Sequence, residues 1–183
     1  LILPADTAWG EADGPARPLA VPPRVLVSRD AIQAGARALR NGATTTLLLG
    51  GDALRGKALE YAGRIAAKTG CNLFSEAANA RVERGAGRPP VKQLPFLVDP
   101  AVAALKGTRQ LALVGAKTPV AFFAYPNKPS VLIPKDCEVI PVAAAEDDLE
   151  AALAGLAGAL SANDVAPLAS DATYNTEIGR AHV

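Results

Sequence analysis

The sequence predicts an α/β fold: a doubly wound, parallel, Rossmann-like sheet of about six strands, built as a single domain with a tail at each end. Two observations lead to this prediction. Short apolar runs rich in β-branched residues alternate with longer amphipathic segments along the 183 residues. These short runs are apolar throughout, which is typical of parallel strands covered by helices on both faces. A chain of this length can bury one sizeable core.

The first half of the domain is predicted to contain two helices and two strands. Ser28 is a favoured N-cap residue, so the first helix begins there. Gly50 and Gly51 separate an apolar run from the next amphipathic segment, and Gly70 ends that segment. In chain order, these elements are a helix over 28–40, a strand over 44–49, a helix over 54–68 and a strand over 71–74.

The second half is predicted to add a short helix, three strands and a closing helix, after a loop over 79–95 that is rich in Arg, Gly and Pro. The closing helix has leucines at helical spacing on one stripe. Acidic residues 146–148 occupy its first turn, where the helix dipole favours negative charge. In chain order, these elements are a helix over 100–105, strands over 110–114, 130–133 and 138–142, and a helix over 146–160. Residues 47–49, 111–114 and 131–133 are expected at the centre of the sheet.

Charge and composition exclude several classes of function. Nineteen Lys and Arg residues balance eighteen Asp and Glu residues, which leaves a formal net charge of +1. This balance provides no basic surface for nucleic acid or an anionic membrane, and no apolar run is long enough to span a bilayer. We therefore expect neither a nucleic-acid nor a membrane partner. Cys71 and Cys137 are far apart, which favours two reduced thiols in a cytoplasmic protein over a disulfide framework or a metal site.

The junction between the strand over 44–49 and the following helix is the most informative local feature. Gly50 and Gly51 allow backbone N–H groups to converge at a helix N-terminus, where an anion is favoured. Glu76 follows the next strand, at the position where dinucleotide-binding folds place a ligand of the ribose. The Gly-x-Gly-x-x-Gly spacing is absent. A tight turn without a ligand is therefore the alternative to a nucleotide site.

A second motif overlaps this junction. Residues 51–57 match the Gly-x-x-x-x-Gly-Lys pattern of phosphate-binding loops, but Ala58 stands where a hydroxyl would bind Mg²⁺. The sequence also lacks a Gly-x-Ser-x-Gly elbow, and its one histidine, His182, lies in the C-terminal tail. We therefore assign no catalytic residue and no metal ligand.

Three segments together resemble a known family. Residues 1–9, LILPADTAW, resemble the end of the pyrimidine-binding domain in thiamine diphosphate enzymes of the acetolactate synthase type. Residues 83–89, ERGAGRP, and 113–126, LVGAKTPVAFFAYP, are similar to a bacterial branch described as acetolactate synthase-like. The resemblance covers about residues 1–160. It implies the middle one of the family's three domains.

The resemblance also implies a division of the chain into five parts. Residues 1–16 would be the end of the upstream pyrimidine-binding domain, with residues 1–6 as the end of a buried strand. The Pro-rich segment 17–24 is expected to be a linker, residues 25–162 the middle domain, and residues 163–177 a second linker. Residues 178–183, IGRAHV, resemble the in-frame translation of a sequencing-library adapter, and we assign them no biological role.

The cofactors that the resemblance implies belong to the intact parent enzyme. In this family, thiamine diphosphate and Mg²⁺ serve the decarboxylation and carboligation of 2-oxo acids. The activating glutamate lies in the first domain and the metal-binding Gly-Asp-Gly…Asn-Asn motif in the third; this chain contains neither. The expected partners are the missing pyrimidine- and diphosphate-binding domains of the same protein, assembled as a homodimer or homotetramer. The fragment alone is expected to be inactive.

In some members the middle domain also binds FAD or ADP. The residues that we consider candidates for such contacts are Gly50, Gly51, Gly115, Lys117 and Thr118. The alternative function is a stand-alone Rossmann-like module that binds ADP, FAD or NAD through the glycine pair and Glu76.

Overall fold

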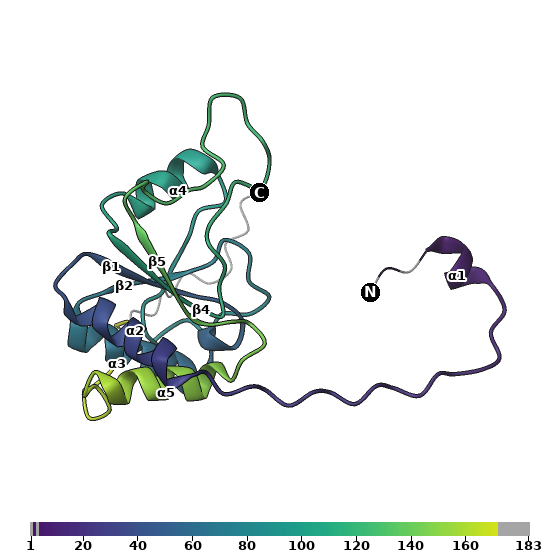
Figure 1. The fold of residues 1–183 in the computed structure, drawn as a ribbon, viewed down its shortest axis with the longest axis horizontal. Coiled ribbons are helices and arrows are strands. Elements are labelled where there is room, and N and C mark those ends of the chain that lie inside the picture. Colours follow the sequence, from purple (N-terminus) through teal and green to yellow (C-terminus); the bar gives the residue numbers. More distant parts are fainter. Residues whose placement is uncertain (1, 3, 172–183) are drawn as a thin grey trace, which may run out of the picture.

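A parallel sheet of five strands, in the order β3-β2-β1-β4-β5, forms the centre of the computed structural model, which describes residue 2 and residues 4–171 (Figure 1). Every pairing between these strands is parallel. The strands are β1 (Thr45–Leu49), β2 (Asn72–Ser75), β3 (Lys92–Gln93), β4 (Gln110–Val114) and β5 (Glu138–Ala143). The helices are α1 (Ala5–Trp9), α2 (Arg29–Arg40), the 3₁₀ helix η1 (Gly51–Leu54), α3 (Gly56–Thr69), α4 (Val98–Leu105) and α5 (Leu149–Ala159).

The two central strands are buried on both faces. Every residue of β1 and β4 is buried, and the two strands pair in register from Thr45↔Gln110 to Leu49↔Val114. Alternate residues of each strand contribute to two separate apolar clusters, one on each face of the sheet. This is the burial that the continuous apolar runs predict.

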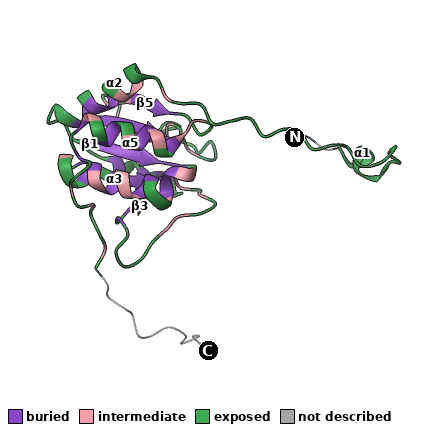
Figure 2. Ribbon diagram, turned by 90° about the horizontal axis from the view of Figure 1, so that it is seen from below, coloured by how far each residue is buried: buried purple, intermediate pink, exposed green. Residues whose placement is uncertain are grey.

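Helices cover both faces of the sheet. Figure 2 shows α2, α5 and α3 side by side on one face, with their buried sides turned toward the strands. On the other face, α4 packs Val98, Ala101 and Leu105 against Leu48 and Leu111. The doubly wound parallel fold predicted from the sequence is confirmed.

The ends of the helices follow from their capping residues. The Ser28 hydroxyl accepts a hydrogen bond from the N–H of Ala31 and begins α2, and Gly70, at φ +74°, ends α3. The helix predicted from residue 54 begins at Gly56 instead. Gly51 and Gly56 both have positive φ, so the chain makes a separate 3₁₀ turn between them. The closing helix begins at Leu149, three residues later than predicted, because Asp148 is its N-cap.

The sheet contains five strands in the described part of the chain, one fewer than the approximate number predicted. Residues 130–133 were predicted as a central strand, but Val131 forms only an isolated antiparallel bridge with Val120. The segment is hydrogen-bonded to the preceding loop, through Ala121 N–H to Ser130 O and Leu132 N–H to Pro119 O. The edge strand β3 was missed because its two residues are polar and exposed.

Phe122, Phe123 and Tyr125 in the loop between β4 and β5, together with Phe96 from the turn before α4, form an aromatic ridge. Neighbouring ring centroids along it lie 5.2, 4.7 and 6.0 Å apart. Each of the four side chains is 40–69% exposed. Lys128 ties the same loop to α4 through an ion pair of 2.7 Å with Asp99.

The connecting segments differ from their predicted form. Ala5 and Asp6 belong to the short helix α1, where the end of a strand was predicted, and Ile2 is exposed and outside any strand. Residues 10–24 form no helix or strand and are exposed (Figure 1). In the predicted second linker, Leu168 N–H donates to Gly63 O and Ser170 N–H to Arg88 O. This linker therefore packs on the domain at least as far as residue 170.

The adapter-like segment 178–183 lies outside the described residues. None of the helices within residues 4–171 combines the length and the apolar character needed to cross a bilayer.

Candidate functional site

The carboxyl ends of β1 and β4 meet at the point where the strand order changes direction. From β1 the chain continues through α3 to β2 and β3 on one side, whereas β4 leads to β5 on the other. In open parallel sheets, ligands bind in the crevice outside such a switch point. The candidate site is therefore the set of turns that follow β1, β2, β4 and β5.

Gly50 and Gly115 bring the turns after β1 and β4 into direct backbone contact. A Cβ atom on Gly50 would lie 2.2 Å from Gly115 O, and one on Gly115 would lie 2.7 Å from Gly50 O. Both N–H groups continue the sheet, since Gly50 donates to Val114 O at 3.0 Å and Gly115 donates to Ala143 O at 2.9 Å. The two glycines are explained by this close approach, without a ligand.

Glu76, directly after β2, spans this junction. Its Oε1 accepts a hydrogen bond of 2.9 Å from the N–H of Lys117. Its Oε2 lies 2.7 Å from the position that a Cβ on Gly50 would take. Its own backbone is held as well, by N–H donation to Leu49 O at 3.1 Å and by acceptance from Asn79 Nδ2 at 2.6 Å. The half-buried carboxylate is thus fixed above the ends of β1 and β4.

A cavity of about 790 Å³ adjoins Glu76, between the start of α2 and the turns after β4 and β5. Ser28 and Ala31 form its α2 side. Its ionisable lining residues are Glu76, Lys117, Glu146 and Asp147, so acidic groups outnumber basic ones three to one. A smaller cavity of about 220 Å³ lies toward the aromatic ridge and shares Glu76, Lys117 and Thr118 with the first.

The structure brings together most of the predicted site residues. Gly115, Lys117 and Thr118 line the larger cavity, and Gly50 contacts Gly115 beside it. Gly51 is turned into η1 and is not among the residues lining either cavity. Sequence reasoning missed the cavity residues from α2 and from the turn after β5, because no local motif marks them.

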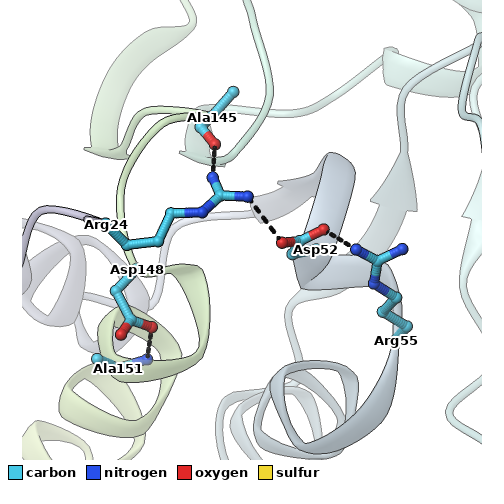
Figure 3. Close-up of polar contacts among 6 residues, drawn as sticks. All are labelled: Arg24, Asp52, Arg55, Ala145, Asp148 and Ala151. Carbon is cyan, nitrogen blue, oxygen red and sulfur yellow. Dashed lines mark hydrogen bonds and ion pairs between the residues drawn. The ribbon is translucent and has the colours of Figure 1, made fainter. Parts of the chain in front are cut away.

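Arg24 fastens the end of the Pro-rich segment to the domain near the same edge (Figure 3). Its Nη1 donates to Ala145 O at 2.8 Å, and its Nη2 pairs with Asp52 Oδ2 at 3.0 Å. Asp52 also pairs with Arg55. Next to this contact, Val25 O accepts the N–H of Asp148 at 2.9 Å. We call these contacts the Arg24 clasp.

The segment that matches the phosphate-binding pattern is engaged internally. Asp52 and Arg55 belong to it and take part in the ion pairs of the clasp. Gly56 N–H, at the start of α3, donates to Glu83 Oε2 at 3.1 Å. A carboxylate of the same chain therefore takes the donor that a phosphate-binding loop would offer to its ligand.

Comparisons with known proteins give the relationships of the chain. No protein-family model matches it. The acetolactate synthase large subunit-like protein IlvX of Mycobacterium tuberculosis is 41% identical over 169 residues, which cover 92% of this chain and 32% of that protein. The chain is related to the acetolactate synthase-like proteins. The resemblance stated from the sequence motifs is confirmed.

Two solved structures share the fold of this chain. A thiamin diphosphate-dependent enzyme described from Mycobacterium smegmatis superposes with a TM-score of 0.55 and 21% identity, over 86% of this chain and 33% of that one. The thiamine diphosphate-dependent 4-hydroxybenzoylformate decarboxylase of Rhodococcus jostii RHA1 gives a TM-score of 0.56 and 22% identity, over 81% and 29%. The chain thus spans about a third of the length of the relatives it matches.

The described residues of this chain offer neither a metal site nor an activated thiol. Within residue 2 and residues 4–171, no group of three His, Cys, Asp or Glu side chains could hold a metal ion. Burial raises the pKa of the Cys71 thiol to about 11. Burial and the charge of Glu138 also raise the pKa of Cys137, so neither thiol is primed as a nucleophile.

Proposed function

We propose that this chain is the middle domain of a longer acetolactate synthase-like enzyme that depends on thiamine diphosphate and Mg²⁺. The main observation behind this proposal is the 41% identity to the IlvX protein, which extends over 92% of this chain but only 32% of that protein. The names of the two structural neighbours, both thiamine diphosphate-dependent, agree with this proposal. The intact enzyme would decarboxylate a 2-oxo acid and join the resulting fragment to a second carbonyl compound, as a cytoplasmic homodimer or homotetramer.

Within that enzyme, we propose a structural role for the domain formed by residues 25–162. Three features support a scaffold: the contact between Gly50 and Gly115, the carboxylate of Glu76 fixed across it, and the excess of acidic groups around the larger cavity. Residues 1–16 would belong to the upstream pyrimidine-binding domain, 17–24 and 163–177 to the two connections, and 178–183 to no functional part. Nucleotide contacts by Gly50, Gly51, Gly115, Lys117 and Thr118 stay a prediction.

The second candidate function is a stand-alone nucleotide-binding module. The observation that favours it is the cavity of about 790 Å³ at the switch point of the sheet, which is the usual place for a nucleotide in parallel α/β folds. FAD or ADP would be the ligand.

The parent assignment is tested by the intact reading frame. We expect an upstream glutamate and a downstream Gly-Asp-Gly…Asn-Asn motif in the same protein, and Mg²⁺-dependent release of CO₂ from a 2-oxo acid once thiamine diphosphate is added. Their absence from the intact frame would rule out the proposal.

The scaffold role is tested by isothermal titration of this chain with thiamine diphosphate and Mg²⁺, with ADP and with FAD. We expect no binding heat in the three titrations and no turnover of pyruvate, because a thiamine site needs groups from two further domains. Binding of thiamine diphosphate would show that the chain is misplaced in the enzyme. Saturable binding of ADP or FAD would favour the second candidate function.

A further inference from the structure

Glu76 occupies the place where a parallel sheet of this topology would receive the phosphate of a ligand. Its carboxylate lies above the ends of β1 and β4 and accepts the N–H of Lys117 at 2.9 Å. We propose that Glu76 is an internal anion that closes the switch-point crevice against phosphate-bearing ligands. The inference deepens the scaffold role proposed above and rests on it, but its test measures binding. It can therefore fail while the assignment to a thiamine diphosphate enzyme stands.

The backbone donors around the crevice support this closure. A phosphate at a switch point is normally held by free N–H groups of the glycine-rich turns. Here Gly50 and Gly115 donate to strand carbonyls, and the N–H of Lys117 is taken by Glu76. A ligand phosphate that sought the N–H of Lys117 would have to displace the carboxylate.

The space around Gly50 supports it as well. A Cβ on Gly50 would lie 2.7 Å from Glu76 Oε2 and 2.2 Å from Gly115 O. The carboxylate and the neighbouring turn therefore leave no room above Gly50 even for a methyl group. A phosphate is larger than a methyl group, so Gly115 O and the carboxylate together keep it away from Gly50, and the carboxylate alone keeps it from the N–H of Lys117.

The charge of the adjoining cavity also disfavours a bound phosphate. Among the described residues, Glu76, Glu146 and Asp147 line the cavity, and Lys117 is the one basic residue beside them. Asp147 is held there by the N–H of Ala144, which donates to its carboxylate at 2.7 Å. A diphosphate in this cavity would face like charges at short range, which costs affinity.

The size of the expected effect follows from the equilibrium between closed and open forms. A ligand that binds only the open form has its affinity reduced by the fraction of molecules that are open. A hydrogen bond to a charged group favours the closed form by roughly tenfold to a hundredfold. Removal of the carboxylate should therefore strengthen phosphate binding by about the same factor.

The experiment compares this chain with two variants, Glu76→Ala and Glu146→Ala. The second variant is the matched control, because it removes one negative charge from the same cavity at an exposed position and leaves the N–H of Lys117 bonded. ADP and inorganic pyrophosphate are the probes, titrated into each protein by calorimetry. We expect Glu76→Ala to bind ADP at least about tenfold more tightly than the wild type, and Glu146→Ala to stay close to the wild type.

A second measurement keeps the proposal testable if Glu76→Ala does not fold. Glu76→Gln has nearly the same shape but loses the charge and replaces one acceptor oxygen with an NH2 donor. Amide hydrogen exchange at Lys117 reports on the contact directly. We expect this amide to be protected in the wild type and to exchange several-fold faster in Glu76→Gln. The proposal is overturned if the wild type binds ADP as tightly as a folded Glu76→Ala. It is equally overturned if the Lys117 amide exchanges at the same rate in the wild type and in Glu76→Gln.

Discussion

Gly50→Ala tests whether the carboxyl ends of β1 and β4 hold the domain together. The new Cβ would lie 2.2 Å from Gly115 O and 2.8 Å from Gly115 C, both backbone atoms. No rotamer change can relieve these contacts, so the two turns would have to separate by roughly 1 Å. The strands behind them are paired in register up to Leu49↔Val114, and that separation would break the ladder.

The expected cost is about 3 kcal/mol or more, at the upper end of the range for overpacked sites, because a rigid backbone must yield. For a chain of this size, this loss lowers the melting temperature by about 6–12 °C. The assay is urea unfolding followed by circular dichroism, supported by a thermal melt.

Gly158→Ala is the matched control for the same substitution in a place with room. Its Cβ would lie 3.6 Å from the side-chain amide nitrogen of Asn163, which is an ordinary van der Waals contact. Because Gly158 lies within α5, alanine there should stabilise the protein by about 0.5–1 kcal/mol. If the free energy of unfolding of Gly50→Ala lies within about 1 kcal/mol of the wild-type value, the two turns do not approach each other as closely as described above.

Three further predictions concern other parts of the chain. The pKa of Cys71, about 11, lies above the usual 9.0 of a thiol, so its contribution to the free energy of unfolding is complete below pH 9 and is lost as the pH rises from 9 to 11. Cys71→Ala should remove about 3 kcal/mol of this pH dependence, as measured by urea unfolding at each pH. Arg24→Ala should speed amide exchange at Asp148 several-fold while lowering global stability by less than about 1 kcal/mol, since the clasp is exposed; Arg17→Ala, in the exposed linker, should change neither. Asp148→Ala should cost about 1 kcal/mol in urea unfolding, because the N–H of Ala151 loses its cap; an unchanged midpoint would exclude that role.

Local chemistry explains which parts of the fold could be predicted from the sequence. The apolar runs of β1 and β4 are buried on both faces as predicted. Ser28 caps α2 through its hydroxyl, and Gly70 ends α3 because a residue without a Cβ adopts positive φ easily. The edge strand β3 carries no such pattern, since its two residues gain their conformation by pairing with β2. Residues 130–133 have the composition of a strand but bond to the loop before them.

The candidate site also has a part that could be predicted from the sequence and a part that could not. Gly50, Gly115 and Lys117 could be grouped because the carboxyl ends of parallel strands share one edge. The contact that defines the site, from Glu76 to the N–H of Lys117, joins residues 41 positions apart. From the sequence, Glu76 stood at the position of a ribose ligand in dinucleotide-binding folds, with a tight turn without a ligand as the alternative. In the structure, its carboxylate accepts the backbone N–H of Lys117. This contact depends on how close the turns after β2 and β4 lie to each other, which no local sequence motif indicates.

The aromatic ridge has a consequence for how copies of this chain behave in concentrated solution. Proteins remain dispersed largely through mutual charge repulsion, and the formal net charge here is only +1. Four rings exposed together in one ridge add a directional attraction to that weak repulsion. We expect salting-out anions such as sulfate, which strengthen apolar association, to promote contacts between copies through this ridge.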